Sequence, residues 1–385
     1  MKRPPPAYDA FAITALGLEP ITVRELHAIG ASDARPIDGG VSFSASPHLL
    51  YSANLRLRTA SRVVVRASAF EATAFHELER RAKKVRWDEL IGPNQRVSLR
   101  VTCRKSKLYH SDAVAERVAG AIEATVKGVR LVDDSGDDGE GTEQLILVRL
   151  LHDRCTISVD SSGVLLHRRG YRQAVAKAPM RETLAAAMLL ASGWDGSVPL
   201  LDPMCGSGTI AIEGALIARR IAPGLERHFA FERWPTFDAT RWKEIVAGAR
   251  SEILPASPVV IQGSDRDAGA IEAASSNAAR VAVTADVEFA VQPISAIRPP
   301  PGLGLVATNP PYGVRVGEAD RVRNLYAQFG KVMSARCEGW TITMVSADPK
   351  LERQTGIMFK PLFVTSNGGI RVRVVSAKSA ERREG

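Results

Sequence analysis

The residues with the clearest chemical potential lie in a turn at positions 202–209, DPMCGSGT, between an apolar run and an amphipathic segment. Gly206 and Gly208 allow a tight turn, and because they lack Cβ atoms a ligand can approach the main chain. A helix that begins at Thr209 would add unpaired N–H groups and a positive dipole end. Asp202 would repel a diphosphate but attract the ammonium group of an amino-acid moiety. The turn therefore favours S-adenosylmethionine over a dinucleotide, with a purely structural glycine loop as the alternative.

An acidic residue at the end of the next strand would hold the ribose hydroxyls of such a cofactor. Asp265 is the better placed and Asp267 the second, both within the run GSDRD at 263–267. The usual separation from glycine turn to ribose acid is about 20 residues, and here it is far longer. The intervening residues 221–256 contain aromatic side chains that could cover a target base, although packing onto the sheet is the favoured interpretation. These aromatic residues are Phe229, Phe231, Trp234, Phe237 and Trp242.

A second turn, Asn309-Pro310-Pro311-Tyr312, follows the apolar run 303–308 directly. Ligands bind at the carboxyl ends of parallel strands, so Asn309 is expected at that edge. The two prolines stiffen the turn. The side-chain oxygen of Asn309 and the carbonyl of Pro310 could accept hydrogen bonds from an exocyclic NH2 group, and Tyr312 offers a flat surface to a flipped base. Because a sulfonium is already a reactive methyl donor, positioning and electrostatics would supply the rate; a rigid structural turn is the alternative.

Both turns need a scaffold that brings strand ends together, and the pattern after about residue 178 predicts one. Strand-like runs alternate with helical runs, which indicates a mostly parallel sheet with helices on both faces. The predicted strands are 198–201, 259–264, 287–291, 303–308, 340–346 and 370–375, and the predicted helices are 209–220, 268–279 and 321–335.

The chain before residue 160 predicts mixed α and β structure, and we place a domain boundary between Asp160 and Ala178. Alternating apolar residues indicate strands, and helical periodicity with turn residues at the ends indicates helices. The predicted strands are 8–16, 41–43, 62–66 and 97–101, with a hairpin of 145–151 and 155–160. The predicted helices are 20–29, 47–56, 75–86 and 110–127, and 133–140 is an exposed acidic loop.

The basic composition fits a polyanionic partner, since the formal net charge is +9. Basic residues concentrate at 80–86, where a solvated helix face explains them equally well, and at 104–110. In the second segment an aromatic ring and an imidazole add stacking and hydrogen-bonding groups to the charges. We therefore expect RNA binding at Arg104, Lys105, Lys107, Tyr109 and His110.

Several classes of protein are excluded by composition. The four cysteines form no C-x-x-C pair and no cluster with zinc-ligand spacing, so we expect reduced cytosolic thiols and no metal. The most apolar stretch, 184–191, is too short to span a bilayer, and no signal peptide is recognised. We expect a cytoplasmic protein without membrane contact, and the oligomeric state is left open.

The two turns, together with APMRET at 178–183 and LHRRGYR at 166–172, resemble those of THUMP-containing RNA methyltransferases that modify guanine N2. These include the bacterial 23S rRNA enzyme and related tRNA enzymes. The resemblance extends through GLE at 17–19, YSANLR at 51–56, RTASR at 58–62 and SKLYH at 106–110, so it covers nearly the whole chain. The NPPY turn alone is less specific, because adenine-N6 DNA and glutamine-N5 protein methyltransferases share it.

The resemblance implies an α/β protein with a C-terminal Rossmann-like class I methyltransferase domain and an N-terminal α+β ferredoxin-like and THUMP region. The implied divisions are 1–65 (ferredoxin-like), 66–165 (THUMP), 166–378 (methyltransferase) and 379–385 (tail). One departure is Gln292, which stands where the family tends to carry an acidic residue near the adenine amino group. The expected cofactor-binding residues are Thr183, Asp202, Pro203, Cys205, Gly206, Gly208, Thr209, Asp265, Arg266, Gln292 and Asn309, and the expected catalytic residues are Asn309, Pro310, Pro311 and Tyr312.

The leading hypothesis is therefore transfer of a methyl group from S-adenosylmethionine to guanine N2 in structured RNA, with 23S rRNA processing as the expected role. A tRNA guanine or a DNA adenine is the alternative substrate, and an RNA-binding N-terminal half argues against DNA. A non-catalytic RNA-binding or assembly factor that keeps a methyltransferase fold is the alternative of another class.

Overall fold

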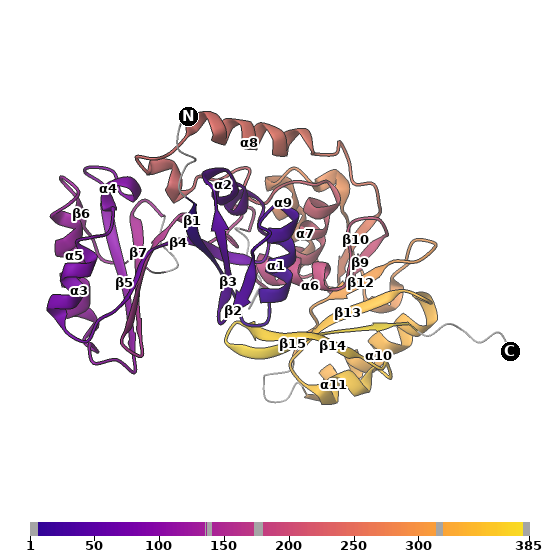
Figure 1. Ribbon diagram of the computed structural model, residues 1–385. Coiled ribbons are helices and arrows are strands. Elements are labelled where there is room, and N and C mark those ends of the chain that lie inside the picture. Colours follow the sequence, from indigo (N-terminus) through magenta and orange to yellow (C-terminus); the bar gives the residue numbers. More distant parts are fainter. Residues whose placement is uncertain (1–6, 135, 137–140, 173–179, 313–318, 380–385) are drawn as a thin grey trace. The chain divides into compact units, whose positions relative to one another are not determined.

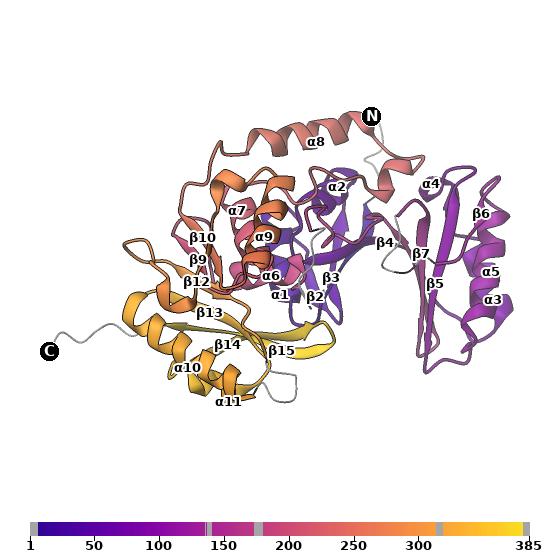
Figure 2. The same cartoon turned by 180° about the vertical axis from the view of Figure 1, so that it is seen from behind.

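A computed structural model describes residues 7–134, 136, 141–172, 180–312 and 319–379 (Figures 1 and 2). The Ala178-Pro179 motif, most of the expected acidic loop and all but the first residue of the expected tail lie outside these residues. The chain divides into two compact units. The N-terminal unit comprises Met1–Thr14, Thr22–Leu166 and Glu226–Gly248, and the C-terminal unit comprises Ala15–Ile21, His167–Leu225 and Ala249–Gly385.

The N-terminal unit is built on an eight-stranded sheet in the order β2-β3-β1-β4-β8-β7-β5-β6. The pairs are antiparallel except that β5 runs parallel to β7 and to β6. The long strand β4 joins the two halves, since it pairs with β1 through its first residues and with β8 through its last. The strands are β1 (Tyr8–Thr14), β2 (Arg35–Ile37), β3 (Gly40–Ala45), β4 (Ala60–Glu71), β5 (Arg96–Arg104), β6 (Arg130–Leu131), β7 (Gln144–Leu151) and β8 (Arg154–Asp160).

One face of this sheet is apolar and buried, as the alternation of its strands predicts. Val65 of β4 lies opposite Val159 of β8, and Val159 lies opposite Ile146 of β7; all three are buried. Figures 1 and 2 show α3 and α5 lying along the same side of β5 and β7. The helices of this part are α1 (Glu19–Ala28), α2 (Pro47–Arg56), α3 (Phe75–Ala82), α4 (Trp87–Leu90) and α5 (Ser111–Glu123).

The segment Glu226–Gly248 belongs to the N-terminal unit although it lies between two elements of the C-terminal sheet. Its aromatic side chains pack around Tyr51 of α2. Phe231 stacks on Tyr51 with ring centroids 4.4 Å apart, and Trp242 meets both rings edge-on. The expectation that these aromatics pack onto the C-terminal sheet is therefore wrong, because Tyr51 provides a stacking partner that the linear sequence does not reveal. The segment contains η2 (Ala230–Arg233) and begins α8 (Ala239–Ser251).

The C-terminal unit is a seven-stranded sheet in the order β11-β10-β9-β12-β13-β15-β14. Strands β9 to β13 are parallel, and β15 runs antiparallel between β13 and β14. The strands are β9 (Leu200–Asp202), β10 (Ile261–Asp265), β11 (Glu288–Val291), β12 (Leu305–Thr308), β13 (Thr341–Ser346), β14 (Lys360–Asn367) and β15 (Ile370–Lys378).

Both faces of this sheet are covered, as a parallel sheet requires. Leu305 and Ala307 of β12 join one buried cluster with α6, α7 and α9, while Val306 between them joins a second cluster with α10. The helices are α6 (Glu182–Ala191), α7 (Thr209–Ala218), α9 (Ala268–Arg280), α10 (Ala319–Arg336) and α11 (Pro349–Gln354), with η3 (Thr284–Asp286) and η4 (Ile294–Ala296). The predicted α/β fold class is confirmed.

Three predicted helices are shorter than the sequence indicates, since those predicted over 75–86, 110–127 and 209–220 end at Ala82, Glu123 and Ala218, and several elements were not predicted. The helix predicted over 75–86 ends at Ala82, because the buried Trp87 indole N–H donates to the Ala82 carbonyl and turns the chain into α4. Strands β2, β6 and β14 and helices α4, α6, α8 and α11 were not predicted. None of the helices that the structure describes is long and apolar enough to cross a membrane.

Candidate active site

The two turns singled out in the sequence begin on neighbouring parallel strands. The Thr308 hydroxyl, at the end of β12, donates a 2.8 Å hydrogen bond to Asp202 Oδ1, at the end of β9. The chain runs from β9 outward through β10 to β11 and then returns to β12 on the other side of β9. The pair β9–β12 is therefore the switch point at which open α/β sheets bind ligands.

The glycine turn has the backbone geometry that a close ligand requires. Gly206 and Gly208 have φ of +52° and +83°, which disfavours any residue with a side chain. A Cβ at Gly208 would lie 2.9 Å from Ala274 Cβ, whereas a Cβ at Gly206 would meet nothing within 4 Å. Gly208 thus lets the turn pack onto the protein, and Gly206 leaves its main chain open to a ligand. Helix α7 begins at Thr209, as predicted.

Asp202 is a buried carboxylate whose neighbours include a hydroxyl and a backbone N–H. Its Oδ1 accepts from Thr308 and, at 3.3 Å, from the Met204 N–H, and these are its hydrogen bonds within the described residues. Burial raises the pKa of Asp202 to about 7, and the negative charge of Asp265 adds to the rise. Oδ2 is left to accept from a further donor. A cation beside it would stabilise the charged form, so the site fits the ammonium group of an amino acid.

Asp265 and Gln292 end two more strands at the same sheet edge. Asp265 Oδ2 accepts from the Gly206 N–H at 3.0 Å, which ties β10 to the glycine turn. The Gln292 N–H donates to the Asp265 carbonyl at 2.9 Å. Asp267 accepts from two N–H groups at the start of α9 and caps that helix. Asp265 Oδ1 accepts from the Asp267 N–H at 3.1 Å, so each oxygen of Asp265 has one partner and keeps a lone pair for a ligand hydroxyl. Asp267 Oδ1 accepts from both helix N–H groups.

The Asn309 turn contains a hydrogen-bond chain. The Tyr312 hydroxyl donates to Asn309 Oδ1, and Asn367 Nδ2 donates to the Tyr312 hydroxyl at 3.4 Å. Asn367 is buried at the end of β14. Tyr312 is half-buried against the apolar cluster beneath, and this burial raises its pKa to about 12. Since an amide oxygen has two lone pairs, Asn309 keeps one for an incoming amine.

The remaining expected cofactor residues differ in placement. Pro203, Cys205 and Thr209 are buried parts of the turn itself, and the Cys205 N–H donates to the Ser264 carbonyl of β10 at 2.9 Å. Arg266 is exposed after β10. Thr183 is buried on α6, and no hydrogen bond joins it to the turn among the residues that the structure describes.

The linker motif LHRRGYR at 166–172 contacts α7 and the residue that precedes Arg181 and α6. Arg169 forms a buried ion pair of 2.9 Å with Glu213 of α7, and the Tyr171 hydroxyl donates to the same carboxylate at 3.0 Å. Arg172 donates to the Met180 carbonyl just before α6. The two contacts with Glu213 fix α7, whose N-terminus follows the glycine turn.

The expected RNA-binding segment lies in the N-terminal unit, in the loop between β5 and α5. Arg104, Lys105, Lys107, Tyr109 and His110 are all exposed, and the Tyr109 and His110 rings lie 4.1 Å apart. Lys107 is held by its N–H, which donates to Asp153. The cysteines are unpaired, and among the described residues no group of three His, Cys, Asp or Glu side chains could hold a metal.

Comparison with known proteins assigns the C-terminal part of the chain. Residues 169–364 match the model of the methyltransferase domain described as RMKL-like. The chain belongs to the RMKL-like methyltransferase family. Residues 9–64 match the ferredoxin-like domain of RlmL, and residues 72–160 match the THUMP domain. The resemblance found in the sequence is thereby confirmed, and the cofactor of this RMKL-like methyltransferase is S-adenosylmethionine, which the open Gly206 main chain and the spare oxygen of Asp202 fit.

Similar proteins are known across the whole chain. A protein of Synechocystis sp., provisionally named an RNA methyltransferase, is 36% identical over 94% of this chain and 94% of its own. The ribosomal RNA large subunit methyltransferase K/L of Syntrophotalea carbinolica is 35% identical over 97% of this chain, which spans 54% of that relative. A crystal structure of a provisionally assigned methyltransferase complexed with SAH has a TM-score of 0.87 and 27% identity, covering 99% of this chain and 100% of its own.

Three polar residues of the site escaped the reasoning from sequence. Thr308 looked like the last residue of an apolar strand, and Asn367 lay in a strand that was not predicted. Asn277, whose amide donates to the Ser207 carbonyl at 3.1 Å, looked like any polar residue of α9. The Asn367-Gly368-Gly369 run is a hairpin signal that could have revealed β14.

Proposed function

We propose that this chain methylates the exocyclic N2 amine of a guanine in RNA, with large-subunit ribosomal RNA as the substrate. The observation that carries the proposal is the Thr308–Asp202 hydrogen bond, since it starts the cofactor turn and the Asn309 turn on adjacent strands. The relatives named above as RNA and ribosomal RNA methyltransferases, together with the THUMP match, support RNA as the polymer.

In this proposal the protein holds the methyl donor at the ends of three strands, β9, β10 and β11. Asp202 Oδ2 accepts from the ammonium group, the main chain at Gly206 lies along the ligand, and Asp265 accepts from ribose hydroxyls. Gln292, which follows β11, accepts from the adenine amino group through its amide oxygen. When bound, the cofactor supplies an electrophilic methyl group on a sulfonium.

The acceptor side positions a nitrogen rather than activating it. Asn309 Oδ1 and the Pro310 carbonyl accept the two N–H groups of the amine, so that its lone pair is directed outward from the turn. Tyr312 and Asn367 fix the orientation of the Asn309 amide. The amine nitrogen forms the new bond to carbon, the carbon–sulfur pair stays on sulfur, and the amine proton leaves to solvent. Preorganised acceptors supply the rate without an acid–base residue.

Asn309→Ala tests the catalytic assignment. Turnover should fall by about 100-fold, or about 2.7 kcal/mol, and calorimetry measures separately how much Asn309 contributes to cofactor affinity. Tritium transfer from labelled cofactor to total rRNA, tRNA and genomic DNA, followed by nucleoside mass spectrometry, identifies the polymer and the atom. N2-methylguanosine in tRNA or N6-methyladenine in DNA would replace rRNA in the proposal. Cofactor binding without transfer to any of them would support a non-catalytic RNA-binding factor.

A further inference from the structure

Helix α9 packs against the glycine turn and contacts it at two residues. A Cβ at Gly208 would lie 2.9 Å from Ala274 Cβ, so the turn approaches this helix closely. Three residues further along α9, Asn277 Nδ2 donates to the Ser207 carbonyl at 3.1 Å. Asn277 is fully buried, and the Ser207 carbonyl is therefore directed into the protein. The helix thus determines both where the turn lies and how its central peptide is oriented.

The Ser207 carbonyl lies outside the regular hydrogen bonds of α7. That helix begins at Thr209, and its first backbone hydrogen bond joins the Ile212 N–H to the Gly208 carbonyl at 2.9 Å. A buried carbonyl that lacks a partner costs free energy, so Ser207 needs a donor from another element. Asn277 of α9 supplies that donor.

The orientation of the Ser207–Gly208 peptide decides what the turn presents to a ligand. Gly208 has φ of +83°, and its N–H donates to the Cys205 carbonyl at 2.9 Å. Rotation of this peptide would break that bond and turn the Ser207 carbonyl away from α9, to the side on which the Gly206 main chain is open. A carbonyl oxygen there would repel the carboxylate of an amino-acid ligand. The hydrogen bond from Asn277 opposes this rotation.

Arg280 fixes the amide of Asn277 in turn. Its Nη1 donates to Asn277 Oδ1 at 2.8 Å and to the Tyr171 carbonyl at 3.2 Å. A guanidinium only donates and a carbonyl oxygen only accepts, so between Arg280 and Ser207 the amide has a single favourable orientation. Asn277 and Arg280 are three residues apart and therefore lie on the same side of α9. The donor to Ser207 is thus in place before a ligand binds.

The chain of contacts returns to the helix that follows the turn. The Tyr171 hydroxyl donates to Glu213 Oε1 at 3.0 Å, and both residues are fully buried. Glu213 lies on α7, which starts directly after the turn. The contacts therefore close a ring that consists of Ser207, Asn277, Arg280, Tyr171 and Glu213. This ring holds the turn at its central peptide and also through α7.

We propose that Asn277 is a positioning residue for the cofactor and that Arg280 acts through it. Neither side chain needs to touch the cofactor, because their effect is to hold the Ser207–Gly208 peptide so that the Gly206 main chain stays open. An ordered turn binds its ligand without rearrangement, which favours affinity. The inference rests on the proposed assignment of the glycine turn to the cofactor, and it does not depend on which RNA is methylated.

Titration calorimetry of the intact chain with S-adenosylmethionine and S-adenosylhomocysteine tests this proposal without RNA. The variants are Asn277→Ala, Arg280→Ala, Arg280→Lys and the double variant Asn277→Ala with Arg280→Ala. Val283→Ala is the stability control, because Val283 is fully buried in the apolar cluster next to α9. It should lower the melting temperature of the protein and leave cofactor affinity unchanged.

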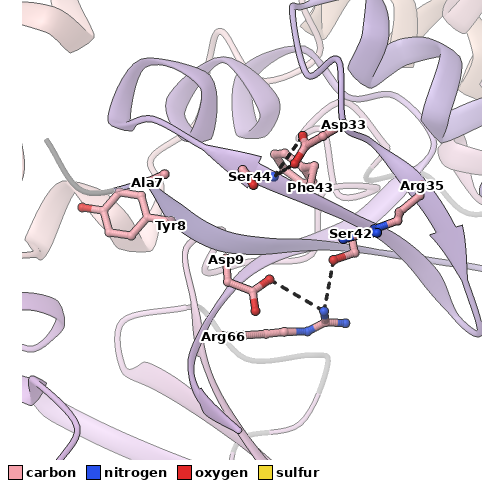
Figure 3. Close-up of a pocket in the computed structure, with 9 residues that line it drawn as sticks. All are labelled: Ala7, Tyr8, Asp9, Asp33, Arg35, Ser42, Phe43, Ser44 and Arg66. Atoms are coloured by element: carbon pink, nitrogen blue, oxygen red, sulfur yellow. Dashed lines mark hydrogen bonds and ion pairs between the residues drawn. The ribbon is translucent and has the colours of Figure 1, made fainter. Parts of the chain in front are cut away.

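A second control addresses a polar recess in the N-terminal unit. A hollow of about 380 Å³ opens there, and Figure 3 shows Asp9, Arg35 and Arg66 on its lining. Charges of both signs suit a zwitterion, so a variant of this hollow reveals whether the cofactor binds there instead. Arg35→Ala removes an exposed guanidinium from the hollow and should leave cofactor affinity within about 2-fold of the wild type.

Asn277→Ala should bind the cofactor roughly 5-fold to 50-fold more weakly than the wild type, because the Ser207 carbonyl loses its buried donor. Arg280→Ala should weaken binding roughly 2-fold to 5-fold, and Arg280→Lys should recover part of this loss because lysine keeps a donor. The double variant should bind within about 2-fold of Asn277→Ala alone, since residues in one network are not additive. Turnover at saturating cofactor should stay within about 2-fold of the wild type, because the Asn309 turn is unchanged.

Unchanged cofactor affinity in Asn277→Ala and Arg280→Ala, with binding impaired in Gly206→Ala, overturns this inference and leaves the proposed function standing. Additive losses in the double variant, or an equal loss in Val283→Ala, overturn it as well, because they indicate general destabilisation. If Asn277→Ala does not fold, the two Arg280 variants decide, since Arg280 is exposed. Wild-type affinity in Gly206→Ala, or loss of binding in Arg35→Ala, overturns the cofactor site of the proposed function and this inference together.

Discussion

Asp202→Asn separates the charge of the cofactor site from its shape. The asparagine keeps an oxygen for the hydrogen bonds from Thr308 and Met204, so the glycine turn should fold. The substitution removes the negative charge that we propose pairs with the ammonium group of the cofactor. The variant therefore isolates one electrostatic contact in an otherwise intact turn.

The magnitude follows from the raised pKa of about 7. A carboxyl with that pKa is roughly half ionised at pH 7 and about 1% ionised at pH 5. The ammonium group of the cofactor loses its own proton near pH 7.8, as α-amino groups do. The cofactor affinity should therefore fall again above about that pH. Only the doubly charged pair binds tightly. Affinity should peak between about pH 7 and 8 and should be about 50-fold weaker at pH 5 than at pH 7.4.

Titration calorimetry with S-adenosylmethionine between pH 5 and 9 measures this profile. At pH 7.4 the Asp202→Asn protein should bind roughly 10-fold to 100-fold more weakly, since a hydrogen bond between charged groups is lost, and its acid limb should be flat. Glu182→Gln is the control, because burial also raises the pKa of Glu182 to about 7 and this carboxyl lies on α6 instead. An acid limb that survives in Asp202→Asn and vanishes in Glu182→Gln would refute the reasoning.

Three further substitutions test separate contacts. Tyr312→Phe removes the hydrogen bond to Asn309 and should lower turnover by about 5-fold to 10-fold at unchanged cofactor affinity; loss of cofactor binding in calorimetry would contradict this. Gly208→Ala, with φ of +83° and a contact of 2.9 Å, should cost about 1–3 kcal/mol of stability, whereas Gly206→Ala should impair mainly cofactor binding; equal melting temperatures would count against the distinction. Phe231→Ala, a fully buried ring, should cost about 3–5 kcal/mol by denaturant unfolding, and a change below about 1 kcal/mol would show that the aromatic stack is dispensable.

The C-terminal fold was predictable because its strands are short apolar runs that stop at recognisable turns. Asp202 and Asn309 were found because glycines and prolines mark turns directly in the sequence, and parallel strands bring such turns to one edge. Helix α6 was missed for the opposite reason. It is apolar on all sides, as buried helices are, and its sequence therefore shows no amphipathic pattern.

Long-range partners were out of reach of the sequence. The stack of Phe231 on Tyr51 joins residues far apart along the chain, and nothing local to either residue indicates the other. The parallel pairing of β5 with β7, which aligns Arg104 with Leu151, depends on a crossover through α5 that only the fold reveals.

The return of Glu226–Gly248 to the N-terminal unit constrains the order in which the chain can fold during synthesis. The aromatic layer over Tyr51 cannot close until Trp242 has been made, by which time β9 and α7 have already been translated. At about 5–20 residues per second, the interval between residues 166 and 242 is roughly 4–15 s. Until its end Tyr51 lacks the full set of rings, so a nascent chain stalled before residue 242 should be the species most exposed to chaperones and proteases.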